Sequence, residues 1–176
     1  MSGTKTPGLT GFRTWVRVRM KASTVLVCVL ANPPTTSGIR TLGRVQQAAE
    51  ILGCERAEVV NLFQIATYRS GGIAEVGTDS DTWHAARDAV DVALDRATHV
   101  LLGYGTTEPT GPARLHHREQ VSWLQQQIAA RGLPTYQVGD GPRHPSRWQR
   151  WTFKNHVGVP FPEALRLSLT LAGQLS

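Results

Sequence analysis

The sequence predicts an α/β fold, a three-layer α/β/α sandwich around a central, mostly parallel four-stranded sheet. Short apolar segments alternate four times with longer segments in which apolar residues recur at helical spacing. Parallel neighbouring strands need crossover connections, and helices commonly supply them on both faces of a sheet. A chain of 176 residues is long enough to bury one complete core and lies within the usual size of a single domain.

Four segments are expected to form the strands: residues 23–31, 58–63, 99–102 and 135–138. The first, STVLVCVLA, is a β-branched apolar run closed by Asn32 and two prolines, which is typical of a strand buried on both faces. The third strand is followed by Gly103, Tyr104 and Gly105. We interpret these residues as a turn, because the rest of a dinucleotide or phosphate-binding motif is missing around them.

Helices are expected over residues 41–52, 81–96, 118–131 and 162–175. The second of these would be capped by Ser80 or Asp79, and its acidic start suits the helix dipole. Gly132 would end the third. The fourth is ambiguous, because leucines alternate over residues 165–171 as in a strand, whereas Pro162 is typical of a helix start; we favour the helix.

Composition limits the class of protein. The chain is 40% hydrophobic and 18% charged, as in an ordinary globular protein, and no apolar run approaches the roughly 20 residues of a membrane span. We therefore expect a soluble protein with no membrane partner, and the cytoplasm as its location, because residues 25–31 are short for a signal-peptide core. Two cysteines are too few for a disulfide framework, so Cys28 and Cys54 are interpreted as core thiols.

Charge is unevenly distributed along the chain. The net charge is +6, and the first 22 residues carry five basic side chains and no acidic one. We interpret residues 1–22 as a flexible basic arm and residues 23–176 as a single α/β domain. Acidic side chains gather over residues 75–95, whereas basic and aromatic side chains are interleaved over residues 143–154. The second cluster indicates a nucleic-acid partner.

Distinctive polar residues follow the predicted strands. Asn32 comes after the first strand, Asn61 lies in the tail of the second, and His144 is in the loop after the fourth. Each has a purely structural interpretation, as a turn cap, a strand-end partner or a packed side chain. Together they favour a site, because ligands of parallel α/β sheets bind beyond the carboxyl ends of the strands.

Several motifs then occur in an order and spacing that resemble the uracil-DNA glycosylase superfamily. They are Ala31-Asn32-Pro33, Val59-Val60-Asn61-Leu62-Phe63, Thr82-Trp83, Leu101-Leu102-Gly103 and His144-Pro145-Ser146, over roughly residues 25–153. The chain also resembles an uncharacterised bacterial family that has Asn-Pro-Ser-Thr-Ala, Asn-Leu-Phe and Pro-Arg-His-Pro motifs; residues 32–36, 61–63 and 142–145 carry that match. The first resemblance implies a uracil-DNA glycosylase-like fold.

The resemblance also implies roles for individual residues. Asn32 stands where the glycosylases place the residue that positions the attacking water, and His144 stands where a histidine hydrogen-bonds the departing base. Asn61 would read the base edge, and Phe63 or Tyr68 would stack on the base. The residues implied to contact nucleic acid are Arg143, Ser146, Arg147, Trp148 and Arg150, with Arg147 and Trp148 in the loop that wedges into the duplex.

The function expected from the resemblance is that of a DNA glycosylase-like hydrolase, which cleaves the N-glycosidic bond of a natural or modified base in DNA. Two alternatives stay open: an enzyme acting on free nucleosides or nucleotides, and a non-catalytic nucleic-acid-binding module. We expect a monomer with no cofactor and no metal. His116 and His117 are interpreted as solvated, because adjacent histidines do not share a helix face.

Overall fold

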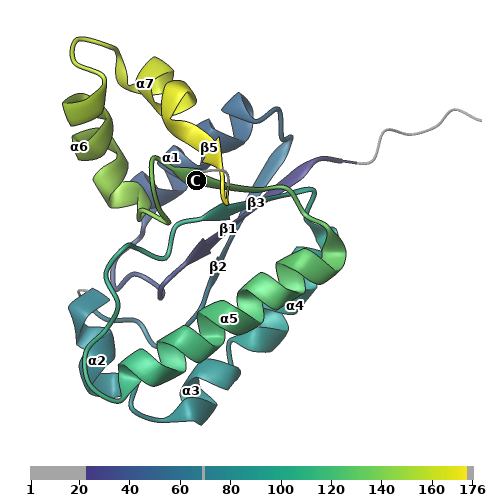
Figure 1. Cartoon of the computed structure of the whole chain (residues 1–176), viewed down its shortest axis with the longest axis vertical. Coiled ribbons are helices and arrows are strands. Elements are labelled where there is room, and N and C mark those ends of the chain that lie inside the picture. Colours follow the sequence, from purple (N-terminus) through teal and green to yellow (C-terminus); the bar gives the residue numbers. More distant parts are fainter. Residues whose placement is uncertain (1–22, 69, 174–176) are drawn as a thin grey trace, which may run out of the picture.

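The computed structural model describes residues 23–68 and 70–173, and it has an α/β fold with helices on both faces of a central sheet (Figure 1). The predicted basic arm, residues 1–22, lies outside the described residues. No helix in the described ranges is long and apolar enough to cross a membrane.

The sheet has five strands in the order β2-β1-β3-β4-β5. Their bounds are β1 Val25–Leu30, β2 Arg56–Asn61, β3 His99–Leu102, β4 Thr135–Val138 and β5 Leu169–Leu171. The first four are parallel, and β5 pairs antiparallel with β4 at one edge. The mostly parallel sheet is confirmed, but the expected number of four strands is wrong.

The helices divide between two layers. One apolar cluster, which includes Val27, Trp83 and Leu124, packs α3, α4 and α5 against one face of the sheet. The other, which includes Leu26, Val45 and Trp148, packs α1, α6 and α7 against the opposite face. The helices are α1 Ile39–Ile51, α2 Ile73–Val76, α3 Ser80–His84, α4 Arg87–Arg96, α5 Ala113–Arg131, α6 Pro145–Asn155 and α7 Phe161–Ser168, with a short 3₁₀ turn at Ser70–Gly72.

Three of the predicted helices differ clearly from the structure. The one expected over residues 118–131 begins earlier, at Ala113. The segment 81–96 is broken after His84 into α3 and α4, and Asp79 occupies the N-cap position. The helix expected over residues 162–175 ends at Ser168, and the following residues form β5. Both patterns in this segment were therefore genuine: an amphipathic helix comes first, and the alternating leucines then pair with β4.

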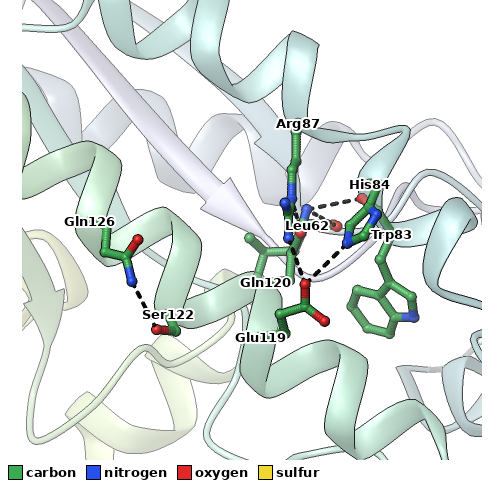
Figure 2. A network of polar contacts seen from close by, with 8 residues as sticks. All are labelled: Leu62, Trp83, His84, Arg87, Glu119, Gln120, Ser122 and Gln126. Carbon is green, nitrogen blue, oxygen red and sulfur yellow. Dashed lines mark hydrogen bonds and ion pairs between the residues drawn. The ribbon is translucent and has the colours of Figure 1, made fainter.

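A buried glutamine fixes the end of β2 to the α5 layer (Figure 2). Gln120 is fully buried, and its amide nitrogen donates to the carbonyl oxygens of Leu62 at 3.1 Å and Trp83 at 3.0 Å. Its amide oxygen accepts from Arg87 Nε at 2.9 Å. One side chain thus satisfies backbone groups of two loops that run toward the carboxyl edge of the sheet.

The two cysteines are both buried, which confirms their interpretation as core thiols. Burial raises the pKa of the Cys28 thiol far above its ordinary value. A thiol in that state is a poor nucleophile, since the thiolate is the reactive form.

Candidate functional site

A cleft of about 670 Å³ opens at the carboxyl edge of the sheet. Its walls come from the segments that follow all four parallel strands, from α5 and from the start of α6. The strands β2 and β3 lie on either side of β1, so the chain reverses its direction of winding at this point. Such switch points are where open α/β sheets bind their ligands.

Asn32 lines this cleft, as the sequence predicts. Its amide nitrogen is anchored to Thr67 Oγ1 at 2.8 Å and to the carbonyl oxygens of Pro33 and Ile65, each at 3.3 Å. Its Oδ1 atom makes no hydrogen bond within the described residues. The anchored nitrogen fixes the orientation of the amide, which leaves the oxygen as an acceptor toward the cleft.

His144 lines the same cleft and is the N-cap of α6. The backbone N–H of Ser146 donates to His144 Nδ1 at 3.2 Å, and Ser146 Oγ lies 2.9 Å from the same nitrogen. Since Nδ1 accepts, the proton of the neutral ring is on Nε2. Burial, helped by the charges of Arg147 and Arg44, holds the pKa of His144 below its ordinary value, so the ring is a neutral donor.

The start of α6 is held in place by close packing and by one arginine. A Cβ atom on Gly103 would meet Leu30 at 2.9 Å, Cys28 at 3.3 Å and Pro145 at 3.4 Å, so only glycine lets α6 approach the end of β3 this closely. Arg44 of α1 donates to the carbonyl oxygen of Pro145 at 2.7 Å. Gly103 therefore does more than form the turn that the sequence suggests.

Basic side chains border the α6 side of the cleft. Arg143, Ser146 and Arg147 all line it. The Arg143 guanidinium pairs with Asp140 at 2.5 Å and lies over the Trp151 ring at 5.4 Å. Arg147 has no ion-pair partner among the described residues, so its charge is available to a ligand.

Asn61 and Phe63 do not line the cleft, which corrects their expected contact with a base. Asn61 is the last residue of β2 and pairs in register with Leu30, so it lies within the sheet and not beyond its edge. The Oδ1 atom of Asn61 is buried without a partner in the described residues. The Phe63 ring is fully buried, 4.6 Å from that of Trp83.

Trp148 also departs from its expected role. Trp148 is fully buried, and its indole N–H donates to the carbonyl oxygen of Arg143 at 2.7 Å. It is a core residue of α6 and is not placed to wedge into a duplex. Arg150 is exposed on α6 but lies outside the cleft lining. The helical spacing of Trp148 and Thr152, both buried, explains why this segment turns its tryptophan inward.

Three aromatic rings lie at or near the cleft lining. Tyr68, one of the two expected stacking residues, lines it and is 81% exposed. Tyr104 and His117 also line it. Two features of the sequence could have revealed them: Tyr104 is flanked by glycines directly after a strand, and His117 lies on the apolar face of a helix. The interpretation of His117 as solvated is wrong, because the residue is only 6% exposed.

The described residues contain no group of three or more His, Cys, Asp or Glu side chains that could hold a metal ion. Comparisons with family models, with curated proteins and with solved structures give no match to this chain. The function is therefore argued from the site itself.

Two histidines of the cleft, the buried His117 and the half-buried His144, predict a pH dependence of stability. Burial lowers the pKa of both His117 and His144 from the ordinary value of 6.5. Their contribution to the free energy of unfolding should thus be complete above pH 6.5 and decline as the pH falls below it, because the unfolded chain binds more protons. Each unit by which a pKa is lowered is worth about 1.4 kcal/mol.

Urea unfolding at pH 7.5, 6.5 and 5.5 measures this decline. The carboxylates with lowered pKa values titrate below 4.5 and stay ionised across the window. Replacing His117 with Phe or His144 with Asn should flatten the profile. A flat profile for the wild type would contradict the prediction.

Proposed function

We propose that this protein hydrolyses the N-glycosidic bond of a natural or modified base in DNA. One observation carries the proposal: Asn32 and His144 line the same cleft at the carboxyl edge of the sheet. These are the two residues to which the resemblance to uracil-DNA glycosylases assigns the chemistry. They come from opposite ends of the sequence, so their meeting in one cleft supports a common role.

The chemistry of the reaction suits these two groups. Cleavage of the bond produces an oxocarbenium-like sugar and an anionic base, so a donor already aimed at the base stabilises the transition state. A neutral His144 with its proton on Nε2 is such a donor. Asn32 Oδ1 would accept a hydrogen bond from the attacking water. The sugar carries positive charge, so a water that is only weakly activated is nucleophilic enough to attack it.

An exposed basic face on α6 supports a polymeric substrate. Arg147, Arg150 and Lys154 follow each other at helical spacing, are all exposed, and make no ion pair within the described residues. Arg147 also reaches the cleft. A row of unpaired basic side chains that extends from the cleft could contact successive phosphates of a nucleic-acid backbone.

The second candidate is hydrolysis of free nucleosides or nucleotides. The burial of Trp148 favours it, because the side chain expected to fill the gap left by a flipped base is part of the core. A monomeric substrate needs no such side chain.

A base-release assay distinguishes the candidates. The protein is incubated with single-stranded and double-stranded oligonucleotides that carry a panel of natural and modified bases, and abasic sites are revealed by alkaline cleavage. Parallel reactions with the matching nucleosides and nucleotides are followed by chromatography of the released base. Abasic sites in DNA support the proposal, and release from monomers alone supports the second candidate. If the protein binds DNA but releases no base in either assay, both hydrolase candidates are refuted and the non-catalytic binding module is supported.

Charge reversal on α6 tests the polymeric substrate. Arg147→Glu combined with Arg150→Glu should weaken DNA binding at least tenfold and flatten its salt dependence, by about 0.9 in the log–log slope for each lost phosphate contact on duplex DNA. Both side chains are exposed, so the melting temperature should stay unchanged. Fluorescence anisotropy over a range of salt concentrations measures both effects.

The control is the double reversal of Arg56 and Arg96, at the start of β2 and the end of α4, which changes the net charge equally. Equal loss of binding in the two double variants would indicate a general charge effect. Full binding by the α6 variant at low salt would favour the monomeric substrate.

A further inference from the structure

His117 of α5 is a buried polar side chain that the proposed chemistry does not use. It is 6% exposed and packs edge-on against the rings of Trp83, at 5.9 Å, and Tyr104, at 6.1 Å. Neither ring nitrogen makes a hydrogen bond to a described residue, and Nδ1 is fully enclosed without a partner.

An imidazole in this state destabilises the folded protein. Leaving a buried donor or acceptor unpaired costs about 1–3 kcal/mol, and such groups in native structures call for an explanation. The neighbours of His117 are aromatic, so phenylalanine would make the same ring contacts without the unpaired nitrogen. A side chain that fits its surroundings worse than an apolar one is expected where a ligand engages its other nitrogen, here Nε2, which is not fully enclosed.

The position of His117 points to the ligand cleft. His117 and Tyr104 line both the 670 Å³ cleft and an adjoining cavity of about 440 Å³. They belong to the α5 layer of the sandwich, whereas His144 and Arg147 belong to the α6 layer (Figure 1). The ligand space therefore has two sides of different chemistry.

The charges of the two sides differ. On the α5 side, Glu108 is neutralised by Arg118 through contacts of 2.8–3.1 Å, and the other polar groups of the adjoining cavity near α5 are uncharged hydroxyls and an amide, from Thr106, Thr107, Ser122 and Gln125. On the α6 side, Arg147 has no ion-pair partner among the described residues. A nucleotide has the same polarity, with an uncharged planar base at one end and a phosphate at the other.

We propose that the α5 side is the base-binding side, with Tyr104 as the stacking ring and His117 as the hydrogen-bonding partner of the polar edge of the base. This inference rests on the proposed function for the class of ligand. Nδ1 of His117 is enclosed, so the other ring nitrogen, Nε2, would make one hydrogen bond to the base edge, as a donor or as an acceptor according to the tautomer. Base–aromatic stacking is worth about 1–3 kcal/mol, so Tyr104 provides much of the affinity.

Binding of free bases tests the inference without requiring catalysis. Protein labelled with ¹⁵N at its histidines is titrated with uracil, cytosine, adenine and hypoxanthine at pH 7.5, and the imidazole nitrogens are followed by NMR. At least one base is expected to shift the His117 nitrogens with saturation. His117→Phe should bind that base at least tenfold more weakly and yet melt at a higher temperature than the wild type.

Matched variants separate polarity from packing. His117→Gln keeps a polar atom at about the distance of Nε2 from the backbone, so it should bind within a few-fold of the wild type. Tyr104→Phe should bind normally, and Tyr104→Leu should lose about tenfold. The measurement on the wild type needs no variant to fold.

Two results would overturn the inference. One is unchanged base binding in His117→Phe, and the other is the absence of any His117 shift with all four bases. The proposed function fails separately, in the base-release assay: base binding at His117 without release of bases from DNA would reject the hydrolase and keep the base-binding side.

Discussion

Replacing His144 with alanine is expected to reduce turnover by about two to three orders of magnitude while DNA affinity stays within a few-fold. The ring is a preorganised neutral donor, because Nδ1 is engaged by the backbone N–H of Ser146. Its contribution grows as negative charge develops on the departing base, so its loss should appear in the rate of the chemical step. Single-turnover cleavage of the best oligonucleotide, with anisotropy for binding, measures the two quantities.

His144 also caps α6, so the alanine variant loses stability as well, by about 1 kcal/mol. His144→Asn controls for this, because asparagine is a good N-cap and has no imidazole. It should retain the melting temperature and show the same loss of turnover. His84→Ala, which removes an exposed histidine paired with Glu119, should be fully active. Normal turnover by His144→Asn would remove His144 from the mechanism.

Gln120→Leu is expected to lower the free energy of unfolding by about 3 kcal/mol. Leucine has nearly the volume of glutamine, so the change leaves no large cavity, but it strands the carbonyl oxygen of Leu62 and removes the acceptor of Arg87 Nε (Figure 2). The carbonyl oxygen of Trp83 loses one of two donors and keeps the backbone N–H of Ala86 at 3.1 Å. Each stranded buried group costs about 1–3 kcal/mol. Urea unfolding at pH 7.5 measures the loss.

Gln126 on the same helix provides the control. It is exposed and lies 3.5 Å from Ser122 Oγ, so Gln126→Leu should change stability by less than about 0.5 kcal/mol. Similar stabilities for the two leucine variants would show that the buried network contributes little. The larger loss should be accompanied by weaker base binding, because Gln120 lies one turn of α5 after His117.

Much of the fold could be predicted from hydrophobic patterning. The strands β3 and β4 begin and end where the sequence predicts, because apolar runs between polar segments leave little choice of bounds. The helix α6 was missed, since its charged residues conceal a narrow apolar stripe that includes Trp148 and Thr152. The fifth strand was missed because a helix and a strand share one leucine-rich segment, and only pairing with β4 decides where one ends.

The candidate site could be predicted in part. Asn32 and His144 were found because residues just beyond parallel strands meet at one edge of the sheet. Asn61 lies inside the predicted strand and is also held in the ladder of β2, so its expected contact with a base rested on the resemblance and not on the strand bounds. His117 was missed for a different reason: the predicted helix begins at residue 118, whereas α5 begins at Ala113 and places His117 on its buried face.

The antiparallel strand β5 has a consequence for how the cleft is completed during synthesis. The loop that leads to His144 is held by groups that come later in the chain: Gly139 N–H donates to the carbonyl oxygen of Ser168 at 2.8 Å, and Thr170 Oγ1 donates to that of Gly139 at 3.0 Å. Every residue that lines the cleft precedes these partners. A nascent chain that has reached residue 160 thus already contains every residue of the cleft lining. It lacks β5, the strand next to the loop that leads to His144. The contacts that fasten Gly139 to the carboxyl-terminal segment therefore form only after residues 168–170 have been translated, when the last strand joins the sheet.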